Sequence, residues 1–131
     1  MPSNIGELNG ASLAYLGDAV LELLVRRYLV QSGEQNLGRL NRRADAYVCA
    51  AAQSRAIERI LPLLNEEELA AFKRGRNTHS QTVPKSATVS EYRRATGMES
   101  LFGFLYLSGQ IARTEALFSA AYASADGESP S

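Results

Sequence analysis

The chain has 131 residues, a length that favours one domain with a single hydrophobic core. Apolar residues make up 45% and charged residues 21% of it, the composition of an ordinary globular protein. Fourteen Lys and Arg residues balance fourteen Asp and Glu residues, so net charge alone does not indicate a nucleic-acid partner. Cys49 is the only cysteine, which excludes an internal disulfide and a cysteine-based zinc site.

The sequence also bears on the compartment. The N-terminal residues MPSNIGELNG lack the charged and apolar regions of a secretory signal. No run approaches the 18 or so apolar residues that a membrane span needs. A lone cysteine is typical of a reducing environment. We therefore expect a soluble cytoplasmic protein without a membrane segment.

Helical periodicity covers almost the whole chain, and no segment has the pattern of a strand. A first long helix is predicted from a cap at Asn9 or Ser12 to about Gln31, with Gly33 as its stop. Its expected buried stripe comprises Leu13, Leu16, Val20, Leu23 and Leu24. A second long helix is predicted over 44–61, ending at Pro62, with Cys49 as a core residue.

The second half of the chain is also predicted to be helical. Its expected elements are a helix capped by Asn65 that ends near Gly75, a loop over 76–87, a helix from Ser86 or Ser90 to Tyr106, and a last helix over 109–123. The polar residues 124–131 are expected to form a disordered tail. The fold class that follows is all-α, with one domain over 1–123.

Charge is concentrated in one place. Residues 73–94 carry six cations and one anion, a net charge of +5. A basic loop in a neutral chain favours a focused anion-binding surface. The alternative is that the residues KRGRN are a solvated helix end, where cations are favourable near the helix C-terminus.

The first helix contains the stretch LAYLGDAVLELLVRR over 13–27, in which Gly17 and Asp18 are adjacent in the helix interior. Gly there costs roughly 1 kcal/mol of helix propensity relative to Ala. One interpretation is a solvated row, in which Ala14, Asp18, Glu22 and Arg26 follow at i, i+4 spacing. The other is that a second backbone passes close to Gly17 and brings a partner group near Asp18.

A candidate partner lies in TGMESLFGFLYLSG over 96–109, where Glu99 and Gly103 are also at i, i+4 spacing on an apolar helix. If the two helices cross at their glycines, Asp18 and Glu99 come together. Paired carboxylates with open positions are typical ligands of Mg²⁺, which keeps several of its waters. A hydrated Mg²⁺ could there activate water against a phosphodiester.

These residues resemble a known family. LAYLGDAVLE resembles the signature of the ribonuclease III catalytic domain, in which a leucine-glycine-aspartate run lies on a long helix. ESLFGFLYLSG is similar to that family's second catalytic helix, with Glu99 at a metal-binding position. KRGRNTHSQTVPK, followed by EYRRATGMESLFGFLYL, resembles the Mini-ribonuclease III branch, a compact bacterial form. The resemblance covers residues 5–123.

The resemblance implies a helical dimer that cleaves double-stranded RNA with Mg²⁺, or Mn²⁺ as a substitute, leaving 5′-phosphate and 3′-hydroxyl ends. Asp18 and Glu99 would be the catalytic and metal-binding residues. It implies a role in maturing the large-subunit (23S-type) ribosomal RNA precursor in a bacterial cytoplasm, with a ribosomal protein as a candidate partner. Ala14 and Thr96 stand where the larger enzymes have acidic residues, and no C-terminal double-stranded-RNA-binding domain is expected.

In this context the basic segment is interpreted as an RNA contact, since duplex RNA is recognised through phosphates and 2′-hydroxyls. The expected contacts are Lys73, Arg74, Arg76 and Lys85 to phosphates and Asn77 and Ser80 to sugar hydroxyls. His79 is interpreted as an RNA contact or a bystander rather than a metal ligand, and Glu22 as a structural residue or one that supports the metal site without binding the ion. Three tyrosines are interpreted as packing residues: Tyr15, Tyr92 and Tyr106. The alternatives are a non-catalytic double-stranded-RNA-binding module on the same fold and, less compatible with the basic loop, a helical protein-interaction domain.

Overall fold

The structure is a computed structural model that describes residues 5–78, 83, 85 and 87–123. Within these residues all regular structure is helical, which confirms the predicted fold class. The elements are η1 (Ile5–Glu7), α1 (Gly10–Gln31), α2 (Leu37–Val48), α3 (Ala50–Ile60), η2 (Leu61–Leu63), α4 (Glu66–Arg76), α5 (Val89–Leu107) and α6 (Ile111–Ala121). None of these helices is long and apolar enough to cross a membrane. The predicted tail over 124–131 lies outside the described residues.

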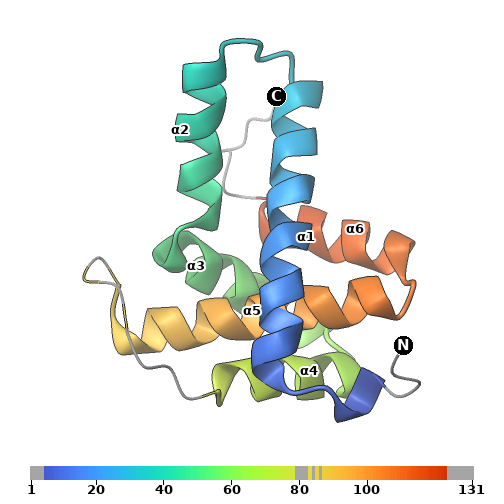
Figure 1. Cartoon of the computed structure of the whole chain (residues 1–131). Coiled ribbons are helices and arrows are strands. Elements are labelled where there is room, and N and C mark those ends of the chain that lie inside the picture. Colours follow the sequence, from blue (N-terminus) through green and yellow to red (C-terminus); the bar gives the residue numbers. More distant parts are fainter. Residues whose placement is uncertain (1–4, 79–82, 84, 86, 124–131) are drawn as a thin grey trace.

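Helix α5 is the centre of the fold. It runs across the molecule and packs against α1, α3, α4 and α6, with α1 crossing over it (Figure 1). Four of its hydrophobic side chains are completely buried: Met98, Leu101, Phe102 and Leu105. Helix α2 packs along the outer half of α1 (Figure 1). The core therefore surrounds α5 and fixes the positions of the α5 side chains that face α1.

The helix ends follow from local sequence. The Asn9 side chain accepts a hydrogen bond from the Ser12 backbone N–H at 2.8 Å and so caps α1. Gly33, with φ of 103°, follows its C-terminus, as predicted. Helix α5 is capped by Thr88 rather than by a serine, because Thr88 and Glu91 form a reciprocal capping box.

The predicted helix over 44–61 is wrong, because the chain bends at Cys49. That residue has extended backbone (ψ of 156°) and separates α2 from α3. The bend lets α2 pack against α1 while α3 packs against α5, which one straight helix could not do. Cys49 is exposed at the bend, so its prediction as a core residue is also wrong.

The buried face of α1 differs in part from the predicted stripe. Leu23 is 64% exposed, while Leu21 and Val25 are completely buried. Gly17 faces α5, and a residue six positions later on a helix is rotated by about 120° from that face. Two aromatic residues predicted to pack, Tyr15 and Tyr106, are likewise exposed, by 86% and 48%.

A buried ion pair joins α4 to α6. Glu68 is 1% exposed, and its carboxylate accepts two hydrogen bonds from the Arg113 guanidinium, at 2.8 and 2.9 Å. These bonds, with one from the Asn65 backbone, hold the pKa of Glu68 below its ordinary value although burial opposes them. The ionised form therefore stabilises the fold above the ordinary carboxyl pKa, and this contribution is lost as pH falls through the lowered one.

We expect Glu68→Gln to lower the free energy of unfolding by about 2 kcal/mol at pH 7, since charge-assisted hydrogen bonds of a buried group are removed. Urea denaturation measures this decrease, which should shrink in acid. The matched control is Glu115→Gln, which removes the exposed Glu115–Arg27 pair on the same helix α6. That change should cost less than about 1 kcal/mol. Equal decreases in the two variants would contradict the stabilising role of the buried pair.

Candidate active site

Helices α1 and α5 cross at two glycines. A Cβ atom on Gly17 would lie 1.6 Å from the carbonyl oxygen of Glu99. A Cβ atom on Gly103 would lie 2.0 Å from the carbonyl oxygen of Leu13. No other residue type fits at either position without separating the helices, so the interpretation of Gly17 as a point of close backbone approach is confirmed.

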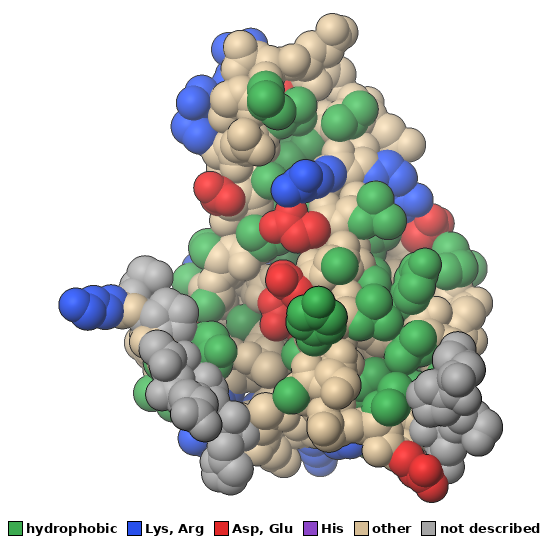
Figure 2. Space-filling model, viewed as in Figure 1, with side chains coloured by type: hydrophobic (Ala, Val, Ile, Leu, Met, Phe, Trp, Pro, Cys, Tyr) green, Lys and Arg blue, Asp and Glu red, His purple; other side chains and the backbone are tan. Residues whose placement is uncertain are grey.

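The crossing brings together the side chains of Asp18 and Glu99, which hydrogen bond to each other. Asp18 is exposed and Glu99 is half-buried, so the pair is open to solvent on the side of α1. Acidic side chains gather on this face, over α1 (Figure 2). Burial, and then the charge of Asp18 and its hydrogen bond, raise the pKa of Glu99 to about 8. The Glu99 carboxyl group thus holds a proton near neutral pH.

This donor set suits a hard divalent cation. A divalent cation that displaces the proton of Glu99 would neutralise the repulsion between this carboxylate and the neighbouring charge of Asp18. Across the described ranges no group of three or more His, Cys, Asp or Glu side chains could hold a metal. A cation at Asp18 and Glu99 would therefore keep several open positions, which is typical of Mg²⁺.

The raised pKa of Glu99 has a consequence for stability. Between the ordinary value of 4.5 and about 8, the folded protein holds a proton that the unfolded chain has released. The free energy of unfolding therefore falls as pH rises through this window. Asp18→Asn removes the neighbouring charge, so we expect a smaller fall between pH 5 and 8 in EDTA, measured by urea denaturation.

The control for this prediction is Glu22→Gln, one turn further along α1. Glu22 lies beside Arg26, whose Nε donates to it at 3.1 Å, and it is not among the groups that raise the pKa of Glu99. Its variant should follow the pH dependence of the parent. Parallel curves for the parent and Asp18→Asn would contradict the coupling between Asp18 and Glu99.

Ala14 and Thr96, the two positions at which the resemblance implied acidic residues in larger enzymes, have different environments. Ala14 is 6% exposed and belongs to the core, so the predicted solvated row does not include it. Thr96 is half-buried, and its hydroxyl donates to the carbonyl of Tyr92 at 3.0 Å. Glu22 and Arg26, two members of that row, form an i, i+4 ion pair on the helix surface, which contributes little to stability.

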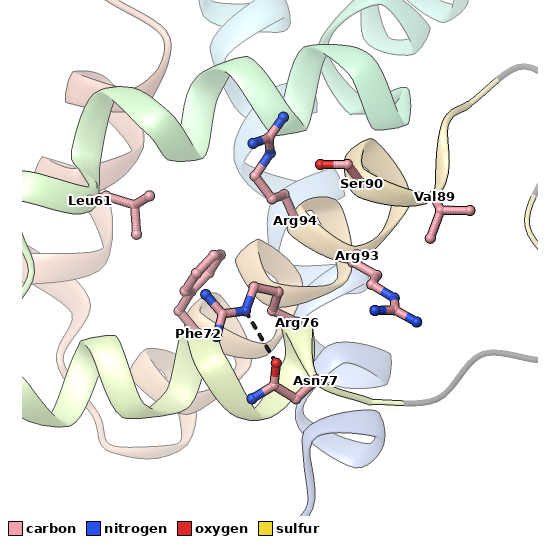
Figure 3. A pocket seen from close by; sticks show the side chains of 8 residues that line it. All are labelled: Leu61, Phe72, Arg76, Asn77, Val89, Ser90, Arg93 and Arg94. Carbon is pink, nitrogen blue, oxygen red and sulfur yellow. Dashed lines mark hydrogen bonds between the residues drawn. The ribbon is translucent and has the colours of Figure 1, made fainter.

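The predicted RNA contacts gather at the C-terminal end of α4. Lys73 and Asn77 are exposed, and Arg76 donates from Nε to the side chain of Asn77 at 3.2 Å (Figure 3). Arg74 instead donates to the carbonyl of Gly6 in η1, which ties the N-terminal turn to α4. Lys85 is exposed in the following loop. The predicted contact Ser80, and His79, lie outside the described residues.

Glycines also position this basic end. A Cβ atom on Gly10 would lie 2.2 Å from the carbonyl oxygen of Arg74, and one on Gly75 would lie 2.4 Å from Cβ of Ser100. The end of α4 is thus pressed against α1 and α5. The residues Arg93 and Arg94 of α5 lie near this end (Figure 3). Both belong to the basic segment over 73–94, but its charge pattern alone predicted no role for either of them.

Known proteins similar to this chain belong to one family. The Ribonuclease III domain family matches residues 11–110. Mini-ribonuclease 3 of Enterococcus faecalis is 46% identical over 113 residues, covering 85% of this chain and 86% of the relative. Mini-ribonuclease 3 of Clostridium tetani is 41% identical, covering 86% of this chain and 75% of the relative.

A solved structure is also similar. The crystal structure of protein FN1578 from Fusobacterium nucleatum has a TM-score of 0.80 and 36% sequence identity, covering 86% of this chain and 92% of that one. The matched family segment includes both helices of the glycine crossing and both carboxylates. The chain therefore belongs to the ribonuclease III family, in its Mini-ribonuclease 3 branch, and is an endoribonuclease of the ribonuclease III type.

Proposed function

We propose that the chain cleaves double-stranded RNA in a Mg²⁺-dependent hydrolysis at Asp18 and Glu99, leaving 5′-phosphate and 3′-hydroxyl ends. The observation that carries the proposal is the carboxyl pair at the glycine crossing, with the pKa of Glu99 raised to about 8. A divalent cation would neutralise such a pair and takes oxygen ligands of this kind. Mn²⁺, with the same preference for oxygen ligands, is expected to substitute.

Asp18 and Glu99 would hold the ion between them. When bound, Mg²⁺ supplies positive charge that activates water and stabilises negative charge developing on the phosphodiester. The protein's own contribution is placement: α1 and α5 cannot slide apart without opening the contact at Gly17 and Gly103. Asp18 is exposed and would be accessible to a substrate, and half-buried Glu99 is fixed by the core around α5.

The proposed substrate is a stem of the large-subunit (23S-type) ribosomal RNA precursor in a bacterial cytoplasm, and a ribosomal protein is a candidate partner that presents it. The relatives are bacterial, which supports the setting. The basic end of α4 supports an RNA substrate, because Lys73 and Lys85 are exposed and can meet phosphates.

We also propose that the chain acts as a homodimer. Three large hydrophobic side chains lie on the outer face of α1: Tyr15, Leu23 and Val30, which are 86%, 64% and 59% exposed. Hydrophobic side chains are spread over this side of the molecule (Figure 2). Such an exposed apolar face is typical of a protein interface. Sedimentation should give a dimer for the parent and a monomer for Leu23→Asp; a monomeric parent would contradict the proposal.

The experiment that tests the activity uses an end-labelled ribosomal RNA precursor with a double-stranded stem, incubated with the protein in Mg²⁺ or in EDTA. Internal cleavage in Mg²⁺ alone is expected. The alternative, a non-catalytic RNA-binding module, is favoured by the missing carboxylates at Ala14 and Thr96. That alternative predicts a shifted RNA band in both conditions and no cleavage in either, which would overturn the proposal.

A separate prediction concerns the contribution of Lys73 and Lys85 to RNA binding. Replacing both Lys73 and Lys85 by Ala should weaken duplex binding and flatten the slope of log affinity against log salt, by about one unit for each phosphate that is no longer neutralised. The effect should be the same for duplexes of different sequence, because phosphate contacts carry no sequence information. Arg42→Ala, at an exposed position of α2, is the control. An unchanged slope in the double variant would remove these lysines from the RNA-binding surface.

A further inference from the structure

Lys73 and Arg74 are adjacent cations at the C-terminal end of α4, but their side chains have different surroundings. Lys73 is exposed, whereas Arg74 is half-buried. Arg74 donates from Nη1 to the carbonyl of Gly6, and its buried Nε has no hydrogen-bond partner among the described residues. A duplex phosphate cannot reach a buried Nε, so this edge of the guanidinium does not offer the pair of donors with which arginine binds phosphate.

The backbone of Arg74 is held as well. Its carbonyl oxygen accepts from the Thr78 hydroxyl at 2.8 Å, and the Thr78 backbone N–H donates to the carbonyl of Gly75 at 3.1 Å. Gly10, the first residue of α1, packs against the same place. A Cβ atom there would overlap the Arg74 carbonyl and lie 2.6 Å from Oγ1 of Thr78. Arg74 thus holds the end of α4 against both η1 and the start of α1.

The end of α4 also packs on the turn of α5 that contains Glu99. A Cβ atom on Gly75 would lie 2.7 Å from the carbonyl oxygen of Thr96 and would overlap the side chain of Ser100. The Ser100 hydroxyl donates to the carbonyl of Ala71 at 2.8 Å. Because Glu99 lies between Thr96 and Ser100 in the sequence, the carboxyl pair and the end of α4 meet the same turn of α5.

Three helices therefore contact one another around the carboxyl pair. Helix α1 crosses α5, α5 packs on α4, and the start of α1 reaches the end of α4 (Figure 1). Asp18 follows Gly10 by eight positions, which is about 12 Å along α1. The contact at Arg74 and Gly10 thus sets how far Lys73 lies from Asp18. That spacing decides which phosphodiester reaches the carboxyl pair when a nearby phosphate binds Lys73.

We infer that Arg74 is a positioning residue for RNA cleavage. It holds the basic end of α4 at a fixed distance from Asp18 and Glu99, and it does not itself bind phosphate. This inference rests on the proposed function, because it concerns the RNA and the carboxyl pair of that site. Without the bond from Arg74, the end of α4 would move relative to the carboxyl pair, and phosphodiesters on either side of the normal one would be cut.

The test compares Arg74→Ala with Lys73→Ala, which removes the same charge from the neighbouring position. Duplex binding is measured in EDTA at several salt concentrations, and cut positions are mapped on an end-labelled duplex in Mg²⁺. Arg74→Ala should weaken binding by about fivefold, the effect of losing one hydrogen bond, with an unchanged slope of log affinity against log salt. It should also spread the cuts over neighbouring phosphodiesters. Lys73→Ala should flatten the slope by about one unit and keep the parent's cut position.

Two further variants separate positioning from charge. Gly10→Ala disturbs the same contact without a change of charge, and it should also spread the cuts. Arg74→Lys keeps a donor for the N-terminal turn and should restore part of the parent's pattern. Hydrogen exchange gives a measure that is independent of RNA. The backbone N–H groups of Asn77 and Thr78, which donate to carbonyls of α4, should exchange faster in Arg74→Ala than in Lys73→Ala.

An equally flattened slope in Arg74→Ala and Lys73→Ala would overturn the inference, because Arg74 would then bind a phosphate. The parent's single cut position in a folded Arg74→Ala protein would overturn it too. Circular dichroism shows whether each variant is folded, and where Arg74→Ala is not, Gly10→Ala supplies the same comparison. A parent that binds the duplex but never cuts it would overturn the proposed function instead, and the slopes in EDTA would still decide whether Arg74 binds phosphate.

Discussion

Asp18→Asn should abolish cleavage of double-stranded RNA, with a decrease of about 10³-fold or more in rate. The change keeps the size of the side chain and removes one of the two charges that would hold Mg²⁺, an ion whose contribution is worth several kcal/mol. RNA binding should be retained because Asp18 lies apart from the basic end of α4, and the dimer should be retained because Asn has the same shape as Asp. Single-turnover cleavage of an end-labelled duplex measures the decrease.

Glu22→Gln is the matched control for this variant, since it neutralises the next carboxylate along α1. Glu22 is paired with Arg26 on the helix surface, and its variant should cleave within a few-fold of the parent. A pure Asp18→Asn protein that cuts at the parent's rate in Mg²⁺ would remove Asp18 from the catalytic site.

Gly17→Ala should destabilise the fold by about 3 kcal/mol or more, although Ala is the better helix former by roughly 1 kcal/mol. The added Cβ would meet the carbonyl oxygen of Glu99 at 1.6 Å, so α1 and α5 must separate. The same movement draws Glu99 away from Asp18, and cleavage should fall in the fraction that stays folded. Urea denaturation followed by circular dichroism measures the change in stability.

Gly38→Ala provides the same substitution at an exposed position of α2, where the added Cβ would lie 3.3 Å from the side chain of Asn36 and would meet no backbone atom of the other described helices. We expect a change of no more than about 1 kcal/mol there. If Gly17→Ala were as stable as Gly38→Ala, the helices would not be held together at their glycines.

The carboxyl pair of the candidate site could be predicted because the sequence pattern that indicates it is local. A glycine in the interior of an apolar helix lowers the stability of that helix, and close approach of a second backbone explains why it is there. In both helices the glycine lies next to a carboxylate or one turn away from it. Gly17 and Gly103 both carry that signal, and the structure joins them. The pairing of Asp18 with Glu99 followed from the crossing.

Other features depend on packing between distant segments and have no local signal. The bend at Cys49 interrupts a run with good helical propensity, because α2 and α3 face different partners. Leu23 is apolar whether it faces the core or an interface, so periodicity alone could not place it. The contact of Glu68 with Arg113 spans 45 positions, and the contact of Arg74 with Gly6 spans 68.

The measurement that tests the central claim most directly is a ¹³C NMR titration of the Glu99 carboxyl, assigned by its disappearance in Glu99→Gln. In EDTA the resonance should titrate with a pKa of about 8, raised by burial and by Asp18. In saturating Mg²⁺ the pKa should fall toward or below the ordinary value of 4.5, because the ion binds only the ionised pair. A titration that is the same with and without Mg²⁺ would contradict the claim that Asp18 and Glu99 form the metal site.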